Sequence, residues 1–535
     1  MKRKIAFLVA ALIALIVASA LLAPKTPTTV LRIVAGSENE PLEPLIREFA
    51  LKEGIGVEIS YLGSVDISRG LAAGKAAEFD AVWPAHSLWI ELGDTQKVVA
   101  HSQSILRSPV VLGVKKPIAA RLGWVGRQDV TIAEIEAAAE RGDFRLAMTS
   151  ATQSNSGASA YLGFLYSLAG NPDMLTMKEL DDPVLQEKMR GLLAQVDRSS
   201  GSSGWLKEAF VEFPESFDAM FNYEAVVIEA NQALAAAGAE PLYIVYPADG
   251  LAVADSPLGL VARGDAAKEE AFLKLQAYLL APQTQAKLSA MGRRAGLIGL
   301  DTEGADKTVW NPDWGIDLNR EIAPIPTPAS EVIAKALSLY QSELRKPSLT
   351  IWVLDVSGSM EGAPLAQLKE AMRLVLDPQA AAVNLLQPSS RDVTIILPFS
   401  SRPQPPTVVS GATSADLAAA LARVEGLQAD GGTDVYGAVG TAIGLLAPYA
   451  EAGTLGDYLP AIVALTDGVS ETYNRDWMAG QIASAPWAQA VPIHSIAFGD
   501  ADEAQLEALS QGSAGRMFQA GADIAKALRS AKGYN

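Results

Sequence analysis

The sequence predicts a protein of the α/β class with more than one domain, and three observations support this. The chain has 535 residues, which is more than one hydrophobic core accommodates, so two to four domains are expected. Hydrophobic residues make up 49% and charged residues 19%, a balance typical of folded domains and not of disorder. Short apolar runs alternate with helical patterns, which predicts mostly parallel sheets covered by helices.

Residues 1–29 are predicted to be a signal peptide or membrane anchor followed by a short tether. Residues 1–4 are basic, and residues 5–23 are uncharged and apolar apart from Ser19. A run of this length can span a bilayer, which takes ~17–25 residues, with the basic end in the cytoplasm. It also resembles a secretory signal with a cleavage site at residues 18–20. The apolar run continues beyond that site, which slightly favours an uncleaved anchor. Both interpretations place the rest of the chain outside the cytoplasm, as a single-pass membrane protein or as a periplasmic or secreted one.

Residues 30–300 are predicted to form one α/β domain. Apolar, β-branched or alternating runs indicate strands at 30–35, 57–61, 79–83, 110–114, 145–148, 226–228 and 242–246. Helical patterns begin at about Ala158 and cover 266–280, where Pro282 ends the second helix. The Gly-Ser-Ser-Gly segment at 201–204 is predicted to be a flexible loop.

Residues 301–346 contain many helix- and strand-breaking residues and are predicted to connect this domain to a second one at 347–533. In that second domain, strands are expected at 349–354, 393–397, 461–465 and 491–498, and helices at 365–376, 417–424 and 435–446. The strands are apolar almost throughout, which is typical of a parallel sheet buried on both faces.

Oxygen-bearing side chains follow two of these buried strands. Asp355, Ser357 and Ser359 come after the first strand, Thr433 lies in a Gly-Gly-Thr-Asp segment, and Asp467 follows a later strand. Loops at the carboxyl ends of parallel strands meet in one crevice. Carboxylates and hydroxyls suit a hard cation, so we expect Mg²⁺ here, or Mn²⁺ or Ca²⁺. Two carboxylates at most balance a divalent ion, so the metal should keep waters and accept one further anionic oxygen. Asp434 is interpreted as the N-cap of the following helix.

These five residues resemble the metal-ion-dependent adhesion site of von Willebrand factor A (VWA) domains, and the resemblance covers about residues 347–532. It implies a doubly wound, Rossmann-like fold. It also implies that Asp355, Ser357 and Ser359 hold the metal directly, that Thr433 joins when a ligand docks, and that Asp467 acts through water. The ligand implied is an Asp or Glu carboxylate of a protein partner.

The first domain resembles two-lobed periplasmic solute-binding proteins of the molybdate-binding kind, in layout more than in a fixed signature. The features that carry this resemblance are residues 33–37, 63–64, 79–82, 152–157 and 281–284. Ser37, Ser64 and the Ser154–Asn155–Ser156 segment precede predicted helices, and helix N-termini suit anions. A small anionic solute is therefore expected. Tyr223 stands where this fold often places a ligand contact. For each serine taken singly, a plain N-cap role is at least as well supported.

Composition and motifs exclude several other functions. A net charge of −18 argues against nucleic-acid binding. The chain has no cysteine, which excludes disulfides, thiol catalysis and a lipidated cysteine. We find no phosphate-binding loop, nucleophile elbow or paired histidine motif, so an enzyme is not expected.

Three hypotheses about function remain. The first is an extracytoplasmic binding or adhesion-type protein whose metal captures an acidic partner. The second is the solute-binding component of an ABC-type transport or sensing system. The third is a chelatase-like or ATPase-associated subunit, against which the predicted export argues.

Overall fold

The computed structural model describes residues 29–294, 305–320, 322–411, 413–467, 469–470, 477–499, 501–513, 515–521 and 524–533. The predicted anchor or signal segment at residues 5–23 lies outside the described residues. No helix in the described part of the chain is long and apolar enough to cross a membrane.

The first lobe is built on a mixed five-stranded sheet in the order β2-β1-β3-β11-β4. Its strands are β1 (Thr29–Ala35), β2 (Ile55–Tyr61), β3 (Ala81–Trp83), β4 (Val99–Ser104) and β11 (Pro257–Val261). Its helices include η1 (Ser37–Leu42), α2 (Glu43–Glu53), α3 (Ser64–Leu71), α4 (Leu88–Gly93), α12 (Ala266–Leu280) and α13 (Pro282–Ala290). β1 pairs in parallel with β2 and β3, whereas β11 runs antiparallel to β3 and β4.

The second lobe carries a mixed sheet in the order β10-β5-β8-β6-β7, with β9 paired to β5. These strands are β5 (Ser108–Lys115), β6 (Leu146–Thr149), β7 (Val196–Ser200), β8 (Ala219–Tyr223), β9 (Leu242–Val245) and β10 (Val253–Ala254). Its helices include α5 (Lys116–Arg121), α6 (Ile132–Glu140), α7 (Asn155–Leu168), α8 (Met177–Leu180), α9 (Pro183–Ala194), α10 (Ser203–Glu212) and α11 (Glu224–Ala236). The chain passes between the lobes from β4 to β5, from β10 to β11 and again after α13, because the segment at 305–320 packs on the second lobe.

Three expectations for these lobes were wrong. The sheets are mixed, because β5 pairs antiparallel with β8, β9 and β10. Residues 226–228 belong to α11 and not to a strand; this helix is buried on nearly every side, so its apolar run carries no helical period. Residues 201–204 are not simply a flexible loop, since Ser202 caps α10 by accepting a hydrogen bond from the backbone N–H of Trp205. The other predicted strands are present.

The segment predicted as a connector packs on the second lobe. Trp310 and Trp314 lie in the same apolar cluster as Ile244, and the Trp310 indole donates to the carbonyl of Ser289 at 3.0 Å. Helix α14 (Ser330–Leu339) and the π-helical turn η4 (Tyr340–Leu344) join the main core of the second lobe.

The C-terminal domain is a six-stranded sheet in the order β14-β13-β12-β15-β16-β17, parallel except for the edge strand β14. Its strands are β12 (Ser348–Asp355), β13 (Val393–Phe399), β14 (Thr407–Ser410), β15 (Leu459–Thr466), β16 (Ile493–Ala497) and β17 (Met517–Gln519). Its helices include α15 (Ala363–Leu376), α16 (Pro378–Val383), α17 (Ser414–Glu425), α18 (Val435–Glu451), α19 (Trp477–Ser484), α20 (Glu503–Gln511) and α21 (Ile524–Gly533). Alternate residues of β12 face two separate cores: Trp352 and Leu354 enter one, and Ile351 and Val353 the other. The predicted strands and helices of this domain are confirmed.

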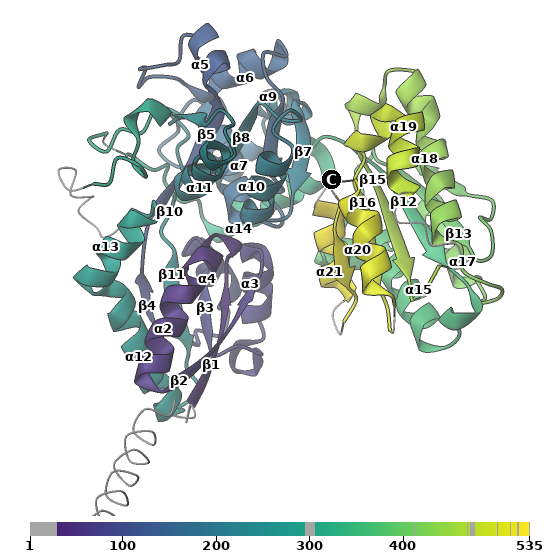
Figure 1. Cartoon of the computed structure of the whole chain (residues 1–535), viewed down its shortest axis with the longest axis horizontal. Helices are drawn as coiled ribbons and strands as arrows, with labels where there is room; N and C mark the ends of the chain where they lie inside the picture. Colours follow the sequence, from purple (N-terminus) through teal and green to yellow (C-terminus); the bar gives the residue numbers. More distant parts are fainter. Residues whose placement is uncertain are drawn as a thin grey trace, which may run out of the picture.

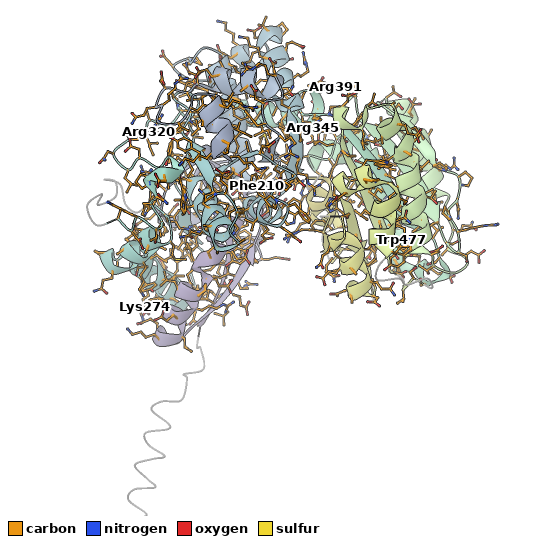
Figure 2. All side chains as sticks on the ribbon, turned by 45° about the horizontal axis from the view of Figure 1, so that its top comes forward. Phe210, Lys274, Arg320, Arg345, Arg391 and Trp477 are labelled. Carbon is orange, nitrogen blue, oxygen red and sulfur yellow. The ribbon has the colours of Figure 1, made fainter. Side chains whose placement is uncertain are left out.

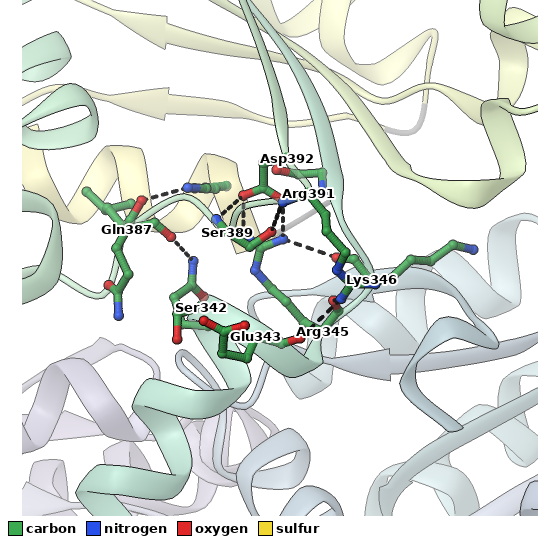
Figure 3. A network of polar contacts seen from close by, with 12 residues as sticks. Ser342, Glu343, Arg345, Lys346, Gln387, Ser389, Arg391 and Asp392 are labelled. Atoms are coloured by element: carbon green, nitrogen blue, oxygen red, sulfur yellow. Dashed lines mark hydrogen bonds and ion pairs between the residues drawn. The ribbon is translucent and has the colours of Figure 1, made fainter. Parts of the chain in front are cut away.

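The C-terminal domain lies beside both lobes, on the side of α3 and β7 (Figure 1). Arg345 follows η4 and Arg391 precedes β13, and the two residues lie close together where the lobes meet the C-terminal domain (Figure 2). There the Arg345 guanidinium pairs with the buried Asp392 carboxylate, which also accepts from the backbone N–H groups of Ser348 and Ser389 at 2.8 Å each (Figure 3). This network fixes the amino-terminal end of β12 against the second lobe.

Candidate metal site and solute cleft

The predicted metal residues emerge at the carboxyl edge of the C-terminal sheet. β12 ends at Asp355 and its parallel neighbour β15 ends at Thr466, with Leu354 in register with Leu465. Asp355 and Asp467 therefore leave adjacent strands at the same level. Asp355 is fully buried, whereas Ser359 is exposed and Asp467 is half-buried.

Four of the five predicted residues are linked by short contacts. The hydroxyls of Ser357 and Ser359 are 3.1 Å apart, and the Ser359 hydroxyl donates to Asp467 Oδ1 at 2.9 Å. Asp355 Oδ1 accepts from the backbone N–H of Ser357 at 2.8 Å, and its Oδ2 accepts from the Thr466 hydroxyl at 2.5 Å. Thr466 was not predicted as part of this group, and its place at the end of a predicted strand was the signal for it.

The loop that carries Thr433 is held against this cluster by its backbone. The N–H of Gly358 donates to the carbonyl of Gly431 at 2.9 Å, and the N–H of Asp430 donates to the carbonyl of Val356 at 2.9 Å. Thr433 itself is almost fully buried and lies two residues beyond Gly431. The interpretation of Asp434 as an N-cap is confirmed, because its carboxylate accepts from the N–H of Gly437 at 3.0 Å.

The donor set fits a small hard cation. Adjacent oxygens in an octahedral Mg²⁺ shell, with bonds of 2.0–2.1 Å, lie about 2.9 Å apart. The Ser357–Ser359 and Ser359–Asp467 separations of 3.1 and 2.9 Å match that spacing. Among the described residues no group of three or more His, Cys, Asp or Glu side chains could hold a metal, so a site here depends on hydroxyl ligands.

The electrostatics of the Asp355 and Asp467 carboxylates also favour a bound cation. Burial raises the pKa of Asp355 above its ordinary range, and the neighbouring Asp467 raises it further against the hydrogen bonds from Ser357 and Thr466. Burial also raises the pKa of Asp467, although its bond from Ser359 opposes this. Two carboxylates that resist ionisation side by side are stabilised by a nearby cation.

The predicted solute residues gather where the two lobes touch. Ser37 of the first lobe accepts from the Ser202 hydroxyl of the second at 2.9 Å. Ser203 contacts both Ser154 and Ser156, at 3.1 and 2.9 Å. Ser154, Ser156 and Ser203 thus form a buried cluster of hydroxyls, and Ser202, the neighbour of Ser203 in the chain, makes a part-buried contact with the first lobe.

Asn155 and Tyr223 extend this cluster. The Asn155 amide donates to the Tyr223 hydroxyl at 3.0 Å and its carbonyl accepts from the Trp89 indole of the first lobe at 2.7 Å. Ser64 stands apart from these hydrogen bonds, since its hydroxyl accepts from the backbone N–H of Ala85 at 3.2 Å within the first lobe.

The plain N-cap role considered for the serines is not what their hydroxyls do. Ser37 and Ser64 are the first residues of η1 and α3, after the N-cap residues Gly36 and Gly63. Ser154 is the N-cap of α7, but its side chain makes no capping hydrogen bond.

A carboxylate that was not predicted shares this cleft. Glu38 follows Ser37 on η1, and its Oε1 is buried without a hydrogen-bond partner. Burial raises the pKa of Glu38 to about 7, although its own backbone N–H and Arg293 oppose that shift. Burial raises the pKa of Tyr223, and the negative charge of Glu38 raises it further. Only the position of Glu38 next to Ser37 could have indicated from the sequence that it belongs to this site. Ser202 and Ser203 lie in the Gly-Ser-Ser-Gly segment that was predicted to be a flexible loop.

Comparison with known proteins assigns both parts of the chain. Residues 31–294 match the family described as bacterial extracellular solute-binding protein, and residues 351–529 match the von Willebrand factor type A domain. The chain therefore carries an N-terminal bacterial solute-binding domain and a C-terminal VWA domain. No curated protein matches it.

Solved binding proteins are similar to this chain over half of its length or more. The sulfate-binding protein SubI from Mycobacterium tuberculosis H37Rv is 21% identical over 56% of this chain and 93% of its own, with a TM-score of 0.37. Maltose-bound MalE3 of T. maritima is 14% identical over 59% and 93%, with a TM-score of 0.42. The Azotobacter vinelandii periplasmic molybdate-binding protein is 17% identical over 50% and 100%, with a TM-score of 0.34.

Proposed function

We propose that this protein is an extracytoplasmic binding protein whose VWA domain captures an acidic group of a protein partner through a divalent metal. Asp355, Ser357, Ser359, Thr433 and Asp467 are the proposed metal-binding residues, and Mg²⁺ is the proposed ion, with Mn²⁺ or Ca²⁺ as substitutes. The observation that carries the proposal is the convergence of Ser357, Ser359 and Asp467 oxygens at octahedral spacing beside the buried Asp355 carboxylate. Attachment to the membrane through residues 5–23 remains a prediction.

The orientation of the domain supports capture of a partner. The amino-terminal ends of β12 and β15 face the second lobe, where Ser348 and Leu459 line a small cavity together with Ser150 and Ser199. The carboxyl ends of the same parallel strands, with the metal residues, therefore point away from the lobes. A partner can reach the exposed Ser359 edge without displacing them.

The charge balance supports an acidic ligand. Two carboxylates compensate a divalent ion, and the hydroxyl ligands add no charge, so a third carboxylate from a partner is attracted once it replaces a bound water. The chain's own charge of −18 disfavours acidic partners at long range, so short-range coordination has to supply the affinity.

The metal site is tested by calorimetric titration of the full chain with Mg²⁺ and Mn²⁺. Asp355→Ala should weaken metal binding by at least about 100-fold, since loss of even an outer-shell partner costs 10–100-fold. The matched control is Asp430→Asn, which removes one exposed charge from the neighbouring loop and keeps its backbone contact; its affinity should change by less than about threefold. Equal metal affinity in all three proteins, or no metal uptake by any of them, would exclude the site.

Partner capture needs its own measurement. A pull-down from an envelope extract in Mg²⁺ should retain a partner that is released by chelator and is absent with Asp355→Ala. Retention that ignores both chelator and the substitution would show that any partner docks elsewhere.

A second proposed function is that of a solute-binding component for transport or sensing, and the cluster of hydroxyls where the lobes touch favours it. The proposed ligand residues are Ser37, Ser64, Ser154, Asn155, Ser156 and Tyr223, with a small anion as the expected solute. Calorimetry with molybdate and sulfate in excess tests this, and Ser154→Ala/Ser156→Ala should abolish any heat observed. Absence of binding to the unchanged protein would argue against an oxyanion and for a docking role of the lobes.

A further inference from the structure

The last helix of the VWA domain contacts both lobes of the solute-binding domain through one residue. The Arg529 guanidinium donates to Asp66 Oδ1 on α3 of the first lobe, at 2.9 Å from Nε and 2.8 Å from Nη2. The backbone carbonyl of the same Arg529 accepts from the Gln153 amide of the second lobe. The pair is shielded from water, with the Arg529 and Asp66 side chains 6% and 15% exposed.

Arg529 contacts two segments that lie directly against each other across the two lobes. A Cβ placed on Gly63, three residues before Asp66, would lie only 2.2 Å from the carbonyl oxygen of Gln153. Gly63 also leads directly into Ser64, and Gln153 into Ser154 to Ser156, so these segments carry the proposed solute residues. Any separation of the lobes moves Asp66 away from Gln153, so that Arg529 cannot then keep both contacts.

The VWA domain is attached differently to the two lobes. Its lead-in helix α14 and Leu385 pack in an apolar cluster built mostly of second-lobe residues, which Leu88 and Trp89 on α4 of the first lobe also enter. Arg516 pairs with Glu208 of the second lobe at 2.8 Å. The contacts to the first lobe are polar: besides Arg529 and Asp66, Arg69 donates to Asn384 at 3.0 Å. The VWA domain itself therefore meets the first lobe through the polar pairs Arg529–Asp66 and Arg69–Asn384, which can break and re-form.

The space around the contact supports a reversible attachment. A groove of about 940 Å³ lies between the first lobe and the VWA domain, and its lining residues include Arg32, Glu58 and Lys526. Asp66, Arg69, Asn384 and Arg529 line the same groove, so the polar contacts lie at the wall of an open space.

We propose that Arg529 is a latch through which the VWA domain holds the two lobes closed, so that opening of the solute cleft requires release of Arg529 from Asp66. The two events are then thermodynamically coupled. A partner that moves α21 away from α3 favours the open cleft, and a ligand that favours the open cleft weakens the contact between the VWA domain and the first lobe. This inference goes beyond the proposed function and does not depend on metal binding.

The test measures the distance between the lobes in the full chain. Because the protein has no cysteine, spin labels can be placed at Glu48→Cys on α2 and Lys178→Cys on α8, both exposed. Double electron–electron resonance should give one short distance between the two labels in the protein that carries no other substitution. Arg529→Ala and Asp66→Asn should each add a longer distance and raise the ratio of open to closed molecules about tenfold or more, since each leaves a shielded charge unpaired.

Two further variants separate the latch from general damage. Arg516→Ala removes an arginine that pairs with Glu208 of the second lobe, and its distance distribution should equal that of the parent. The exchange Asp66→Arg with Arg529→Asp should restore the short distance. Distributions unchanged by both Arg529→Ala and Asp66→Asn would overturn the proposal, as would an opening that Arg516→Ala produces to the same extent.

Discussion

At the scale of single residues, the buried Arg345–Asp392 ion pair is structural and is not part of either candidate site. Asp392 is buried, and burial alone would raise its pKa, but Arg345 and the hydrogen bonds around it lower the pKa to about 2. A buried carboxylate of this kind has a bidentate partner and two backbone donors. Removing one member of such a pair destabilises the fold far more than replacing both members by apolar residues, because the remaining charge stays buried without a partner.

Asp392 gives a prediction for stability against pH. Its folded pKa of about 2 lies below the unfolded value of 3.8, so its contribution is present above pH 4 and is lost as pH falls toward 2. The contribution is about 2 kcal/mol. Asp392→Asn should lower the free energy of unfolding by about 3 kcal/mol at pH 7, and the deficit should shrink toward pH 2. The exposed control Asp457→Asn should change stability little at any pH; an Asp392→Asn deficit that stayed constant with pH would refute the pairing.

Glu38 predicts the opposite dependence. Its folded pKa of about 7 lies above the usual 4.5, so its contribution to stability is complete below pH 4.5 and is lost as pH rises through 7. The closed lobes should lose up to about 3 kcal/mol between pH 4.5 and 8. Glu38→Gln should flatten that part of the thermal-melting profile, whereas Glu40→Gln, an exposed neighbour on η1, should not. Identical profiles for the two variants would show that Glu38 ionises freely.

At the residue scale, the sequence predicts the placement of a side chain where that side chain directly follows a recognisable strand. Asp355 and Asp467 could be placed together because each follows a recognisable buried strand, and parallel strands share an edge. Glu38, Ser202 and Ser203 were missed because their importance comes from the approach of two lobes that are about 165 residues apart in sequence at the Ser37–Ser202 contact, and no local pattern encodes that approach.

At the scale of elements, the buried strands of the VWA domain were predictable and α11 was not. β12 and β15 are short apolar runs with abrupt ends, which a strand explains well. α11 is apolar on most of its faces and follows β8 without a break, so neither a period of 2 nor one of 3.6 residues is visible in it. The edge strands β14 and β17 escaped prediction because both are short and partly exposed.

The segment at 305–320 gives an element-scale prediction. Trp310 is 2% exposed, donates to Ser289 and lies 5.7 Å from the Arg294 guanidinium. Trp310→Ala should therefore destabilise the solute-binding domain by about 3–5 kcal/mol. Calorimetry should show a lower melting temperature for the solute-binding transition and an unchanged VWA transition. Leu51→Ala, at a side chain that is 66% exposed, should leave both transitions in place, and equal effects of the two substitutions would mean that residues 305–320 are a loose tether.

At the scale of the whole molecule, the physical division of the chain differs from the division that composition suggests. Breaker-rich sequence at 301–346 predicts a connector, yet its helix contributes Val332, Ile333 and Leu337 to the core of the second lobe. The lobes, the segment at 305–320 and α14 thus share one packed unit, and the VWA domain begins at the Arg345–Asp392 network.

This division predicts how fragments of the chain behave. A fragment of residues 29–344 keeps the buried apolar side chains of α14 and η4 on their lobe and should melt near the solute-binding transition of the full chain. A fragment of residues 29–300 uncovers that surface; each lost large apolar contact is worth about 1.5–3 kcal/mol, so it should melt much lower and bind a hydrophobic dye. The fragment 345–533 retains Arg345 with Asp392 and all five proposed metal residues, so it should fold alone and bind Mg²⁺ as the full chain does. Equal melting of the two N-terminal fragments would show that residues 301–344 only join two independent domains, and loss of metal binding in 345–533 would show that the metal site needs the lobes.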